Sequence, residues 1–246
     1  MLRLAVTTST RDSGLLDLLT PVFEKEHNAR VDVIAVGTGK SLKLGENGDV
    51  DAILVHARCA EEAFMKGEHG IRRESVMQNS FEVLGPTSDP ADIRGKAAAE
   101  ALRKIAAEKQ RFVSRGDESG THSRELLLWQ AAGGKPAWKA YVESGQGMGA
   151  SLIMADQMQA YILTDRGTYL SFRDKIALVP LVKKSAELLN TYSVIVVNPS
   201  KHSRINDHLA QSFVDYLISP GAQQMIGDHR IDGEPLFQPL RLPKGN

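Results

Sequence analysis

Residues 2–14 read LRLAVTTSTRDSG, a short apolar run that passes directly into hydroxyl-bearing residues and a glycine. The apolar run over 2–7 predicts a buried strand, and the leucines that follow at helical spacing predict a helix over 13–27. A strand that leads through a polar turn into a helix is typical of a β-α-β unit. This opening therefore favours an α/β fold with a parallel sheet.

The same alternation of strand and helix patterns continues outward from this start. Before Gly85-Pro86 it predicts strands over 30–36, 52–55 and 76–84, with helices over 40–47 and 60–66. Beyond Pro86 the pattern restarts. Helices are expected within 90–109 and over 119–132, 149–156, 205–218 and 220–227, strands over 111–114, 159–163, 177–182 and 192–197, and an irregular tail from 232.

Two α/β halves without a low-complexity linker predict two lobes joined by strands that cross between them. The expected crossings are 80–86 and 190–198. Lobe I is then expected to comprise 1–84 plus 193–246, and lobe II 85–192. A fold of this kind binds its ligand in the cleft between the lobes, at the carboxyl ends of the parallel strands.

The composition excludes several classes of protein. Lys plus Arg and Asp plus Glu number 30 each, so the net charge is zero, which argues against a nucleic-acid binder with a broad basic surface. Cys59 is the only cysteine, so the chain has no internal disulfide and no CxxC site. No apolar run approaches the length of a membrane span. Because a strand pattern begins at Leu2, we expect either a cytosolic protein or one whose leader has been removed.

Ser, Thr and Gly cluster where predicted strands lead into helices. These turns are 7–14, 36–41, 114–122, 145–149 and 164–168. A helix N-terminus carries unpaired N–H groups and partial positive charge, glycine lets a ligand approach the backbone, and hydroxyls add donors. Several such turns together predict an anion site. The alternative is that the hydroxyls only cap helices.

Arg115 follows a predicted strand directly, within a turn of glycine and hydroxyl residues. An arginine in this position can bind an oxyanion through two parallel hydrogen bonds. The alternative is a surface arginine that pairs with Asp117 or Glu118.

Enzymatic motifs are absent from the sequence. Gly39-Lys40-Ser41 resembles the end of a P-loop, but Ile34 stands where the first glycine is required. The seven histidines include no HExxH or similar metal-binding pair, and Ser119 has no nucleophile-elbow context. We therefore expect no enzymatic activity, no cofactor and no metal site.

Five segments, in order along nearly the whole chain, closely resemble the tungstate-binding proteins of ABC importers. They are LAVTTSTRDSGLL at 4–16, VIAVGTGK at 33–40, LGENGDVD at 44–51, FVSRGDESGTH at 112–122 and LTDRGT at 163–168. One position departs from the family pattern: Val6 stands where the family's run of hydroxyl residues usually begins.

The resemblance implies a two-lobed periplasmic binding-protein fold, type II-like, that binds a bare tetrahedral dianion between its lobes. By residue matching, the ligand contacts would be Thr8, Ser9, Thr38, Ser114, Arg115, Ser119, Thr121 and Thr164. The resemblance further implies a monomeric receptor outside the cytoplasm, made with a signal peptide, that passes tungstate or molybdate to the membrane permease of an ABC importer.

Three other functions remain open at this point. A phosphate or sulfate receptor would use the same turns, but phosphate carries a proton at neutral pH and needs an acceptor, for which Asp117 is the candidate. An effector-sensing domain of a transcription regulator can share the fold, although no helix-turn-helix precedes residue 2. An enzyme built on these turns would lack a recognisable acid, base or metal set.

Overall fold

The computed structural model describes residues 1–182 and 184–242, and the chain divides into two compact units. Unit 1 comprises Met1–Gln78 with Thr191–Asn246, and unit 2 comprises Asn79–Asn190. Two strands, β4 (Gly70–Gly85) and β9 (Leu189–Val197), contribute residues to both units. The crossing segments expected at 80–86 and 190–198 overlap these two strands.

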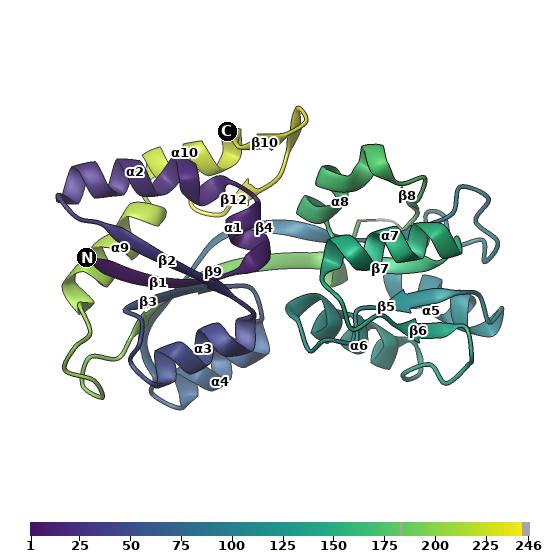
Figure 1. Ribbon diagram of the computed structural model, residues 1–246, viewed down its shortest axis with the longest axis horizontal. Helices are drawn as coiled ribbons and strands as arrows, with labels where there is room; N and C mark the ends of the chain where they lie inside the picture. Colours follow the sequence, from purple (N-terminus) through teal and green to yellow (C-terminus); the bar gives the residue numbers. More distant parts are fainter. Residues whose placement is uncertain (183, 243–246) are drawn as a thin grey trace. The chain divides into compact units, whose positions relative to one another are not determined.

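Unit 1 is built on three parallel strands, β1 (Leu2–Thr7), β2 (Val31–Val36) and β3 (Ala52–Val55), in the order β2-β1-β3. Strand β9 continues this sheet antiparallel to β3. The helices of unit 1 are α1 (Thr8–Asp12), α2 (Leu15–His27), α3 (Thr38–Glu46), α4 (Arg58–Lys66), α9 (Asp207–Leu217) and α10 (Pro220–Asp228). Figure 1 shows α2 and α10 on one side of the strands and α3 and α4 on the other.

Burial on both faces explains why β3 is a continuous apolar run and why β1 is nearly one. Strand β3 is fully buried, and β1 is buried except at Arg3. Helix α3 approaches β3 closely at Gly45, where an added Cβ would lie 2.4 Å from Ile53 Cδ1. The residue must therefore be a glycine for α3 to pack at this distance.

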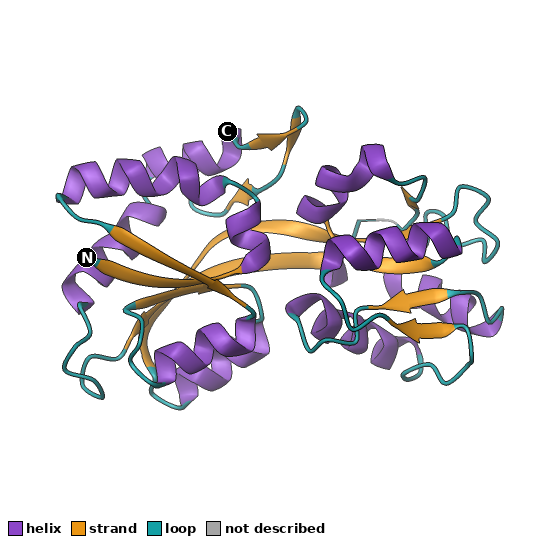
Figure 2. Cartoon of the chain, viewed as in Figure 1, coloured by secondary structure: helices purple, strands orange, loops and turns teal. Residues whose placement is uncertain are grey.

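Unit 2 has a sheet in the order β4-β7-β5-β6, with the short β8 (Val179–Pro180) also paired to β4. Strands β5 (Phe112–Ser114), β6 (Tyr141–Glu143) and β7 (Tyr161–Asp165) are parallel, and β4 is antiparallel to β7. The helices are α5 (Ala98–Ala107), α6 (Gly120–Ala132), α7 (Met148–Met158) and α8 (Arg166–Phe172), with 3-10 turns at Arg173–Lys175 and Ala186–Leu188. Figure 2 shows helices around these strands.

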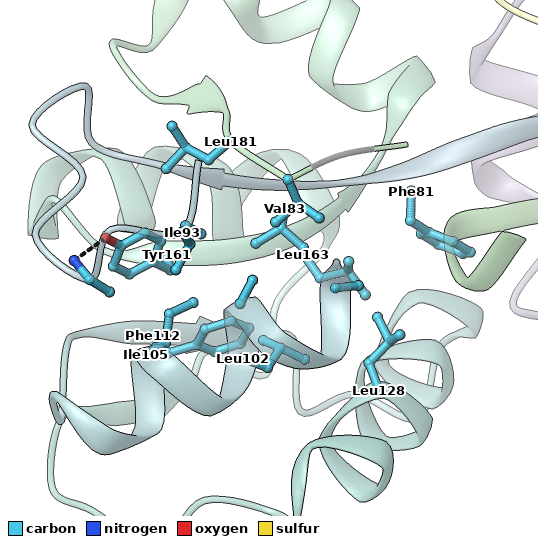
Figure 3. Close-up of a cluster of buried hydrophobic side chains, with 14 of the residues drawn as sticks. Phe81, Val83, Ile93, Leu102, Ile105, Phe112, Leu128, Tyr161, Leu163 and Leu181 are labelled. Atoms are coloured by element: carbon cyan, nitrogen blue, oxygen red, sulfur yellow. Dashed lines mark hydrogen bonds between the residues drawn. The ribbon is translucent and has the colours of Figure 1, made fainter. Parts of the chain in front are cut away.

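The core of unit 2 lies between its sheet and helices α5 and α6. Figure 3 shows Leu102 and Ile105 of α5 beside Phe112, with Leu163 and Val83 above them. Tyr161 ends this cluster, and its hydroxyl accepts a hydrogen bond from Ala91 N (2.9 Å) and donates one to Asp89 Oδ1 (2.9 Å). The Tyr161 hydroxyl therefore ties the start of β7 to the segment around Asp89.

The observed elements differ from the expected ones in several places. Strand β6 was not expected, and only Val179–Pro180 of the expected strand 177–182 is a strand. The polar residues after β1 form the five-residue helix α1, which is too short to show a helical period. Strand β7 runs to Asp165 and passes directly into α8, so 164–168 is a strand end and a helix start rather than a free turn. The expected irregular tail contains the short strands β10 (Arg230–Ile231), β11 (Glu234–Pro235) and β12 (Gln238–Pro239), of which β12 pairs with β4.

Candidate functional site

The first turn of unit 1 is a network of hydroxyl groups between β1 and α1. Thr7 caps α1: its Oγ1 accepts from Thr10 N (3.3 Å) and lies 2.6 Å from Thr10 Oγ1 and 3.2 Å from Ser9 Oγ. The predicted ligand residue Thr8 is exposed, and no described residue forms a hydrogen bond with its side chain. The turn therefore offers Thr8 and Ser9 as donors, while Thr7 and Thr10 hold its shape.

The second turn of unit 1 leads from β2 into α3. Gly37 is the N-cap of α3 and provides no side-chain hydrogen bond, so the first N–H groups of this helix lack a side-chain acceptor. Thr38 follows as the first residue of α3 and is buried. Ser41 Oγ donates to Val6 O (3.3 Å), which ties the start of α3 to the end of β1. Val6 itself is buried in the strand, so it packs where the family pattern has a hydroxyl.

The third turn, in unit 2, holds Arg115 in a defined position. Arg115 Nη2 forms an ion pair with Asp117 Oδ2, and Arg115 Nε donates to Gln146 O (3.3 Å). The other carboxylate oxygen, Asp117 Oδ1, accepts from Ser119 N (3.2 Å). Arg115 therefore forms the pair with Asp117 that the alternative described, but the two side chains are only 16% and 20% exposed.

The backbone of this turn requires an unusual conformation. Gly116 has φ +60°, and an added Cβ would lie 2.7 Å from Glu143 Cβ. Glycine at 116 therefore lets the chain reverse beside β6 and brings Arg115 and Asp117 together.

Helix α6 begins at the far end of the same turn. Ser119 is its N-cap and accepts from His122 N (3.3 Å), and the side chain of Thr121 is buried in its first turn. His122 Nδ1 accepts from Glu118 N (3.0 Å), which assigns the hydrogen of a neutral imidazole to Nε2.

Two buried polar atoms in this region lack a hydrogen-bond partner among the described residues: Ser114 Oγ and His122 Nε2. Ser114 is 0% exposed and His122 is 8% exposed. Leaving a buried donor unsatisfied costs about 1–3 kcal/mol, so such atoms are expected to meet a partner. Both flank Arg115 and the start of α6, where an anion would provide that partner.

The fourth turn supports the third. Gly145 N donates to Arg115 O (2.8 Å), and Ser144 Oγ donates to the same carbonyl (3.3 Å). Helix α7 then begins after Gly147, which provides no side-chain cap. These bonds hold the Arg115 backbone against the residues that follow β6.

The fifth turn uses its hydroxyls within the protein. Thr164 is fully buried in β7, and its Oγ1 donates to Asp165 O (3.2 Å). Asp165 caps α8 by accepting from Thr168 N (2.9 Å) and Thr168 Oγ1 (2.6 Å). Arg166 Nη1 pairs with the buried Glu82 (3.3 Å). The hydroxyl hydrogen of the predicted ligand residue Thr164 is therefore already engaged.

Thus the predicted residues fall into two groups. Thr8, Ser9 and Thr38 lie on adjacent turns of unit 1, and Ser114, Arg115, Ser119 and Thr121 lie on one turn of unit 2. Within residues 1–182 and 184–242, no cluster of three His, Cys, Asp or Glu side chains could hold a metal ion. No helix of the described chain is long and apolar enough to cross a membrane.

The sequence analysis missed Glu125, which lies in α6 beneath this turn. The side chain is 1% exposed, and its Oε1 accepts from Trp129 Nε1 (3.1 Å) and Tyr141 Oη (2.8 Å). Burial raises the pKa of Glu125 to about 7, against the opposing effects of the Tyr141, Ser114 and Trp129 side chains. The sequence did offer one signal of this burial: Glu125 lies on the same face of α6 as Leu128 and Trp129.

Comparison with known proteins agrees with the family expected from the sequence. Residues 3–220 match the PBP superfamily domain. The tungstate-binding protein TupA of Peptoclostridium acidaminophilum is 46% identical over 96% of this chain and 84% of its own length. The solved tungstate-binding protein TupA from Desulfovibrio alaskensis G20 is 44% identical, covers 97% of this chain and 98% of its own, and has a TM-score of 0.90.

A second solved structure, described as the tungstate ABC transporter from Geobacter sulfurreducens, is 49% identical with a TM-score of 0.83. It covers 92% of this chain and 97% of its own. The α/β binding-protein fold expected from the sequence is thereby confirmed. The chain belongs to the PBP superfamily and, within it, to the TupA-like family of tungstate-binding proteins of ABC transporters, which are binding proteins and not enzymes.

Proposed function

We propose that this protein is a receptor for tungstate, with molybdate as its nearest competitor, and that it delivers the anion to the membrane permease of an ABC importer. The observation that carries the proposal is the third turn of unit 2. There an arginine held by a carboxylate lies beside a buried hydroxyl without a hydrogen bond, at the start of a helix. The names of the related proteins support the choice of tungstate.

The proposed ligand groups of unit 2 are Ser114, Arg115, Ser119 and Thr121. An arginine and hydroxyl groups are hydrogen-bond donors, and the first N–H groups of α6 add more donors together with partial positive charge. We also propose Thr8, Ser9 and Thr38 of unit 1 as ligand-binding donors. Thr164 also stays in the proposed set, and its hydroxyl would turn from Asp165 O (3.2 Å) to donate to the anion.

The state of Asp117 favours tungstate over phosphate. One carboxylate oxygen is bound to Arg115 and the other accepts from Ser119 N. The carboxylate is therefore neutralised by the arginine, and each of its oxygens already has a donor from the protein. A phosphate that keeps its proton at neutral pH would bury that donor without a partner, which costs free energy.

We further propose that the protein works outside the cytoplasm as a monomer, with a signal peptide on its precursor. The support is its membership in a family of binding proteins that serve importers. Fractionation of the native host followed by immunoblotting would show whether the protein leaves the cytoplasm.

Calorimetry of the purified protein with tungstate, molybdate, sulfate and phosphate tests the proposed ligand directly. We expect the protein to bind tungstate and molybdate with much higher affinity than phosphate. Tighter binding of phosphate or sulfate than of tungstate would refute the proposal, as would the absence of binding to all four anions.

A further inference from the structure

Glu125 lies directly behind one of the proposed ligand groups. We propose that Glu125 is a proton-linked positioning residue: its neutral carboxyl leaves the Ser114 hydroxyl free to donate to the bound oxyanion, and its carboxylate withdraws that donor. This inference rests on the proposed function, because it concerns affinity for the same anion.

The hydrogen bonds of Glu125 determine where its proton lies. Trp129 Nε1 and Tyr141 Oη both donate to Oε1, so Oε1 has two donors facing it. A proton on the carboxyl therefore belongs on the other oxygen, Oε2. Glu125 can thus accept two hydrogen bonds through Oε1 and still act as a donor through Oε2.

The Ser114 hydroxyl is the group that changes its hydrogen bond when Glu125 gains or loses its proton. Ser114 ends β5 and is fully buried, and its side chain opposes the rise that burial causes in the pKa of Glu125 and of Tyr141. Even so, its Oγ forms no hydrogen bond of ordinary geometry with a described residue. A hydroxyl has one hydrogen to donate and can accept from a second group, so its hydrogen points either to the anion or to a carboxylate.

The two protonation states of Glu125 therefore have different effects. When Glu125 is neutral, Oε2–H donates toward Ser114 Oγ and the serine hydrogen is available to the anion. When Glu125 is ionised, the carboxylate competes for that hydrogen and also places a buried negative charge behind the site of a dianion. Both effects weaken binding, so anion binding favours the neutral form.

The other polar and charged groups around Glu125 could also affect how anion binding depends on pH. Helix α6 contributes Trp129 and His122, and β6 contributes Tyr141 and Glu143, of which Glu143 Oε1 is paired with Lys135 Nζ (2.6 Å). The faces of α5 and β7 that meet this cluster are apolar, apart from the Tyr161 hydroxyl, which is bonded to Asp89. His122, which lies about one turn before Glu125 on α6, is therefore the residue chosen for the control variant.

Linkage gives the sign of the effect. Because burial raises the pKa of Glu125 to about 7, the free protein loses this proton as pH rises through that value. Binding that requires the neutral carboxyl then takes up a proton, and the affinity falls by at most about tenfold for each pH unit above about 7. We expect tungstate affinity to weaken about tenfold or more between about pH 6.5 and pH 8.5.

The test is calorimetry of tungstate binding at about pH 8, in two buffers with different enthalpies of protonation. The difference in apparent enthalpy measures the protons taken up by the wild-type protein. A measurable uptake, together with the predicted fall in affinity, supports the inference. Tungstate binding without proton uptake and without pH dependence overturns it, whereas a wild-type protein that binds no tungstate refutes the proposed function itself.

Three variants show which residue takes up the proton when the anion binds. Glu125→Gln keeps an acceptor for Trp129 and Tyr141 and a donor toward Ser114, so it should lose both the proton uptake and the pH dependence. Ser114→Ala should bind more weakly at low pH and show a smaller pH dependence, which keeps the inference testable if Glu125→Gln does not fold. His122→Gln is the control and should retain the uptake. If Glu125→Gln retains the uptake, or if only His122→Gln loses it, Glu125 does not have this role.

Discussion

The Arg115 guanidinium is bound by the carboxylate of Asp117, two residues along the same turn. The sequence alone left two uses for that carboxylate, to accept a proton from a ligand or to hold the arginine. The structure shows the second, and Asp117 Oδ1 also accepts from Ser119 N, so the pair is fixed to the start of α6. This relationship makes Arg115 a fixed donor and gives each oxygen of Asp117 a partner within the turn.

Replacing Arg115 tests the proposed site. Arg115→Ala removes charge-assisted hydrogen bonds to the anion, each worth about 1.5–3 kcal/mol, so tungstate affinity should fall about tenfold to hundredfold. Arg103→Ala is the matched control, because Arg103 is exposed on α5 and belongs to no proposed site. Calorimetry should show wild-type binding for the control and weakened binding for Arg115→Ala. Equal affinities would remove Arg115 from the site.

Ligand binding should stabilise the folded protein in proportion to its affinity. An anion at about 100 times its dissociation constant adds about 2.7 kcal/mol, which for a protein of this size raises Tm by about 5–10 °C. Tungstate should produce this shift in a thermal melt, and ATP or NAD should not. A shift with a nucleotide and none with tungstate would favour an enzyme.

Glu125 should also make the stability of the ligand-free protein depend on pH. Its pKa is about 7 in the folded protein, above the ordinary value of 4.5, so the folded state binds the proton more tightly than the unfolded state. The stabilisation is fully present below about pH 4.5 and is lost as pH rises toward about 7, by about 3 kcal/mol. Urea unfolding across this range should show the loss in wild type and a smaller loss in Glu125→Gln. Parallel curves for the two proteins would contradict the burial argument.

Elements that follow from a local sequence pattern were predicted, and elements that depend on a particular side-chain contact were not. Strand β3 matches its prediction residue for residue, because a strand buried on both faces is a continuous apolar run. Helix α8 was missed because Arg166 and Gly167 do not read as a helix start; the cap that begins it is the Asp165 side chain.

The candidate site also contains one contact that could be predicted from the sequence and one that could not. Arg115 and Asp117 lie two residues apart, so their pairing could be anticipated from the turn alone. The environment of Glu125 could not be, because Tyr141 comes from a different strand and reaches Glu125 only once β6 has paired with β5. Contacts of that kind depend on tertiary packing and have no periodic signal in the sequence.

Two glycines give a matched test of packing in unit 1. At Gly45 of α3 an added Cβ would lie 2.4 Å from Ile53 Cδ1 and 2.9 Å from Phe64 Cζ, so Gly45→Ala should cost about 1–3 kcal/mol of unfolding free energy. At Gly221 of α10 nothing lies within 4 Å, and Gly221→Ala should be neutral or stabilise by up to about 1 kcal/mol. Denaturant unfolding of both variants measures the difference. A Gly45→Ala protein as stable as Gly221→Ala would mean that α3 does not pack this closely on β3.

Asp117 separates a tungstate receptor from a phosphate receptor. Asp117→Asn keeps the size of the side chain and an oxygen that can accept from Ser119 N, but it removes the charge that holds Arg115. If the carboxylate only positions the arginine, the variant should bind tungstate modestly more weakly, by about tenfold or less, and should gain no preference for phosphate. If it instead accepts the proton of a phosphate ligand, wild type should prefer phosphate, and Asp117→Asn should abolish that preference because an amide cannot take up the proton. Competition calorimetry with both anions on both proteins distinguishes the two cases, and a phosphate preference lost on substitution would rule out the tungstate assignment.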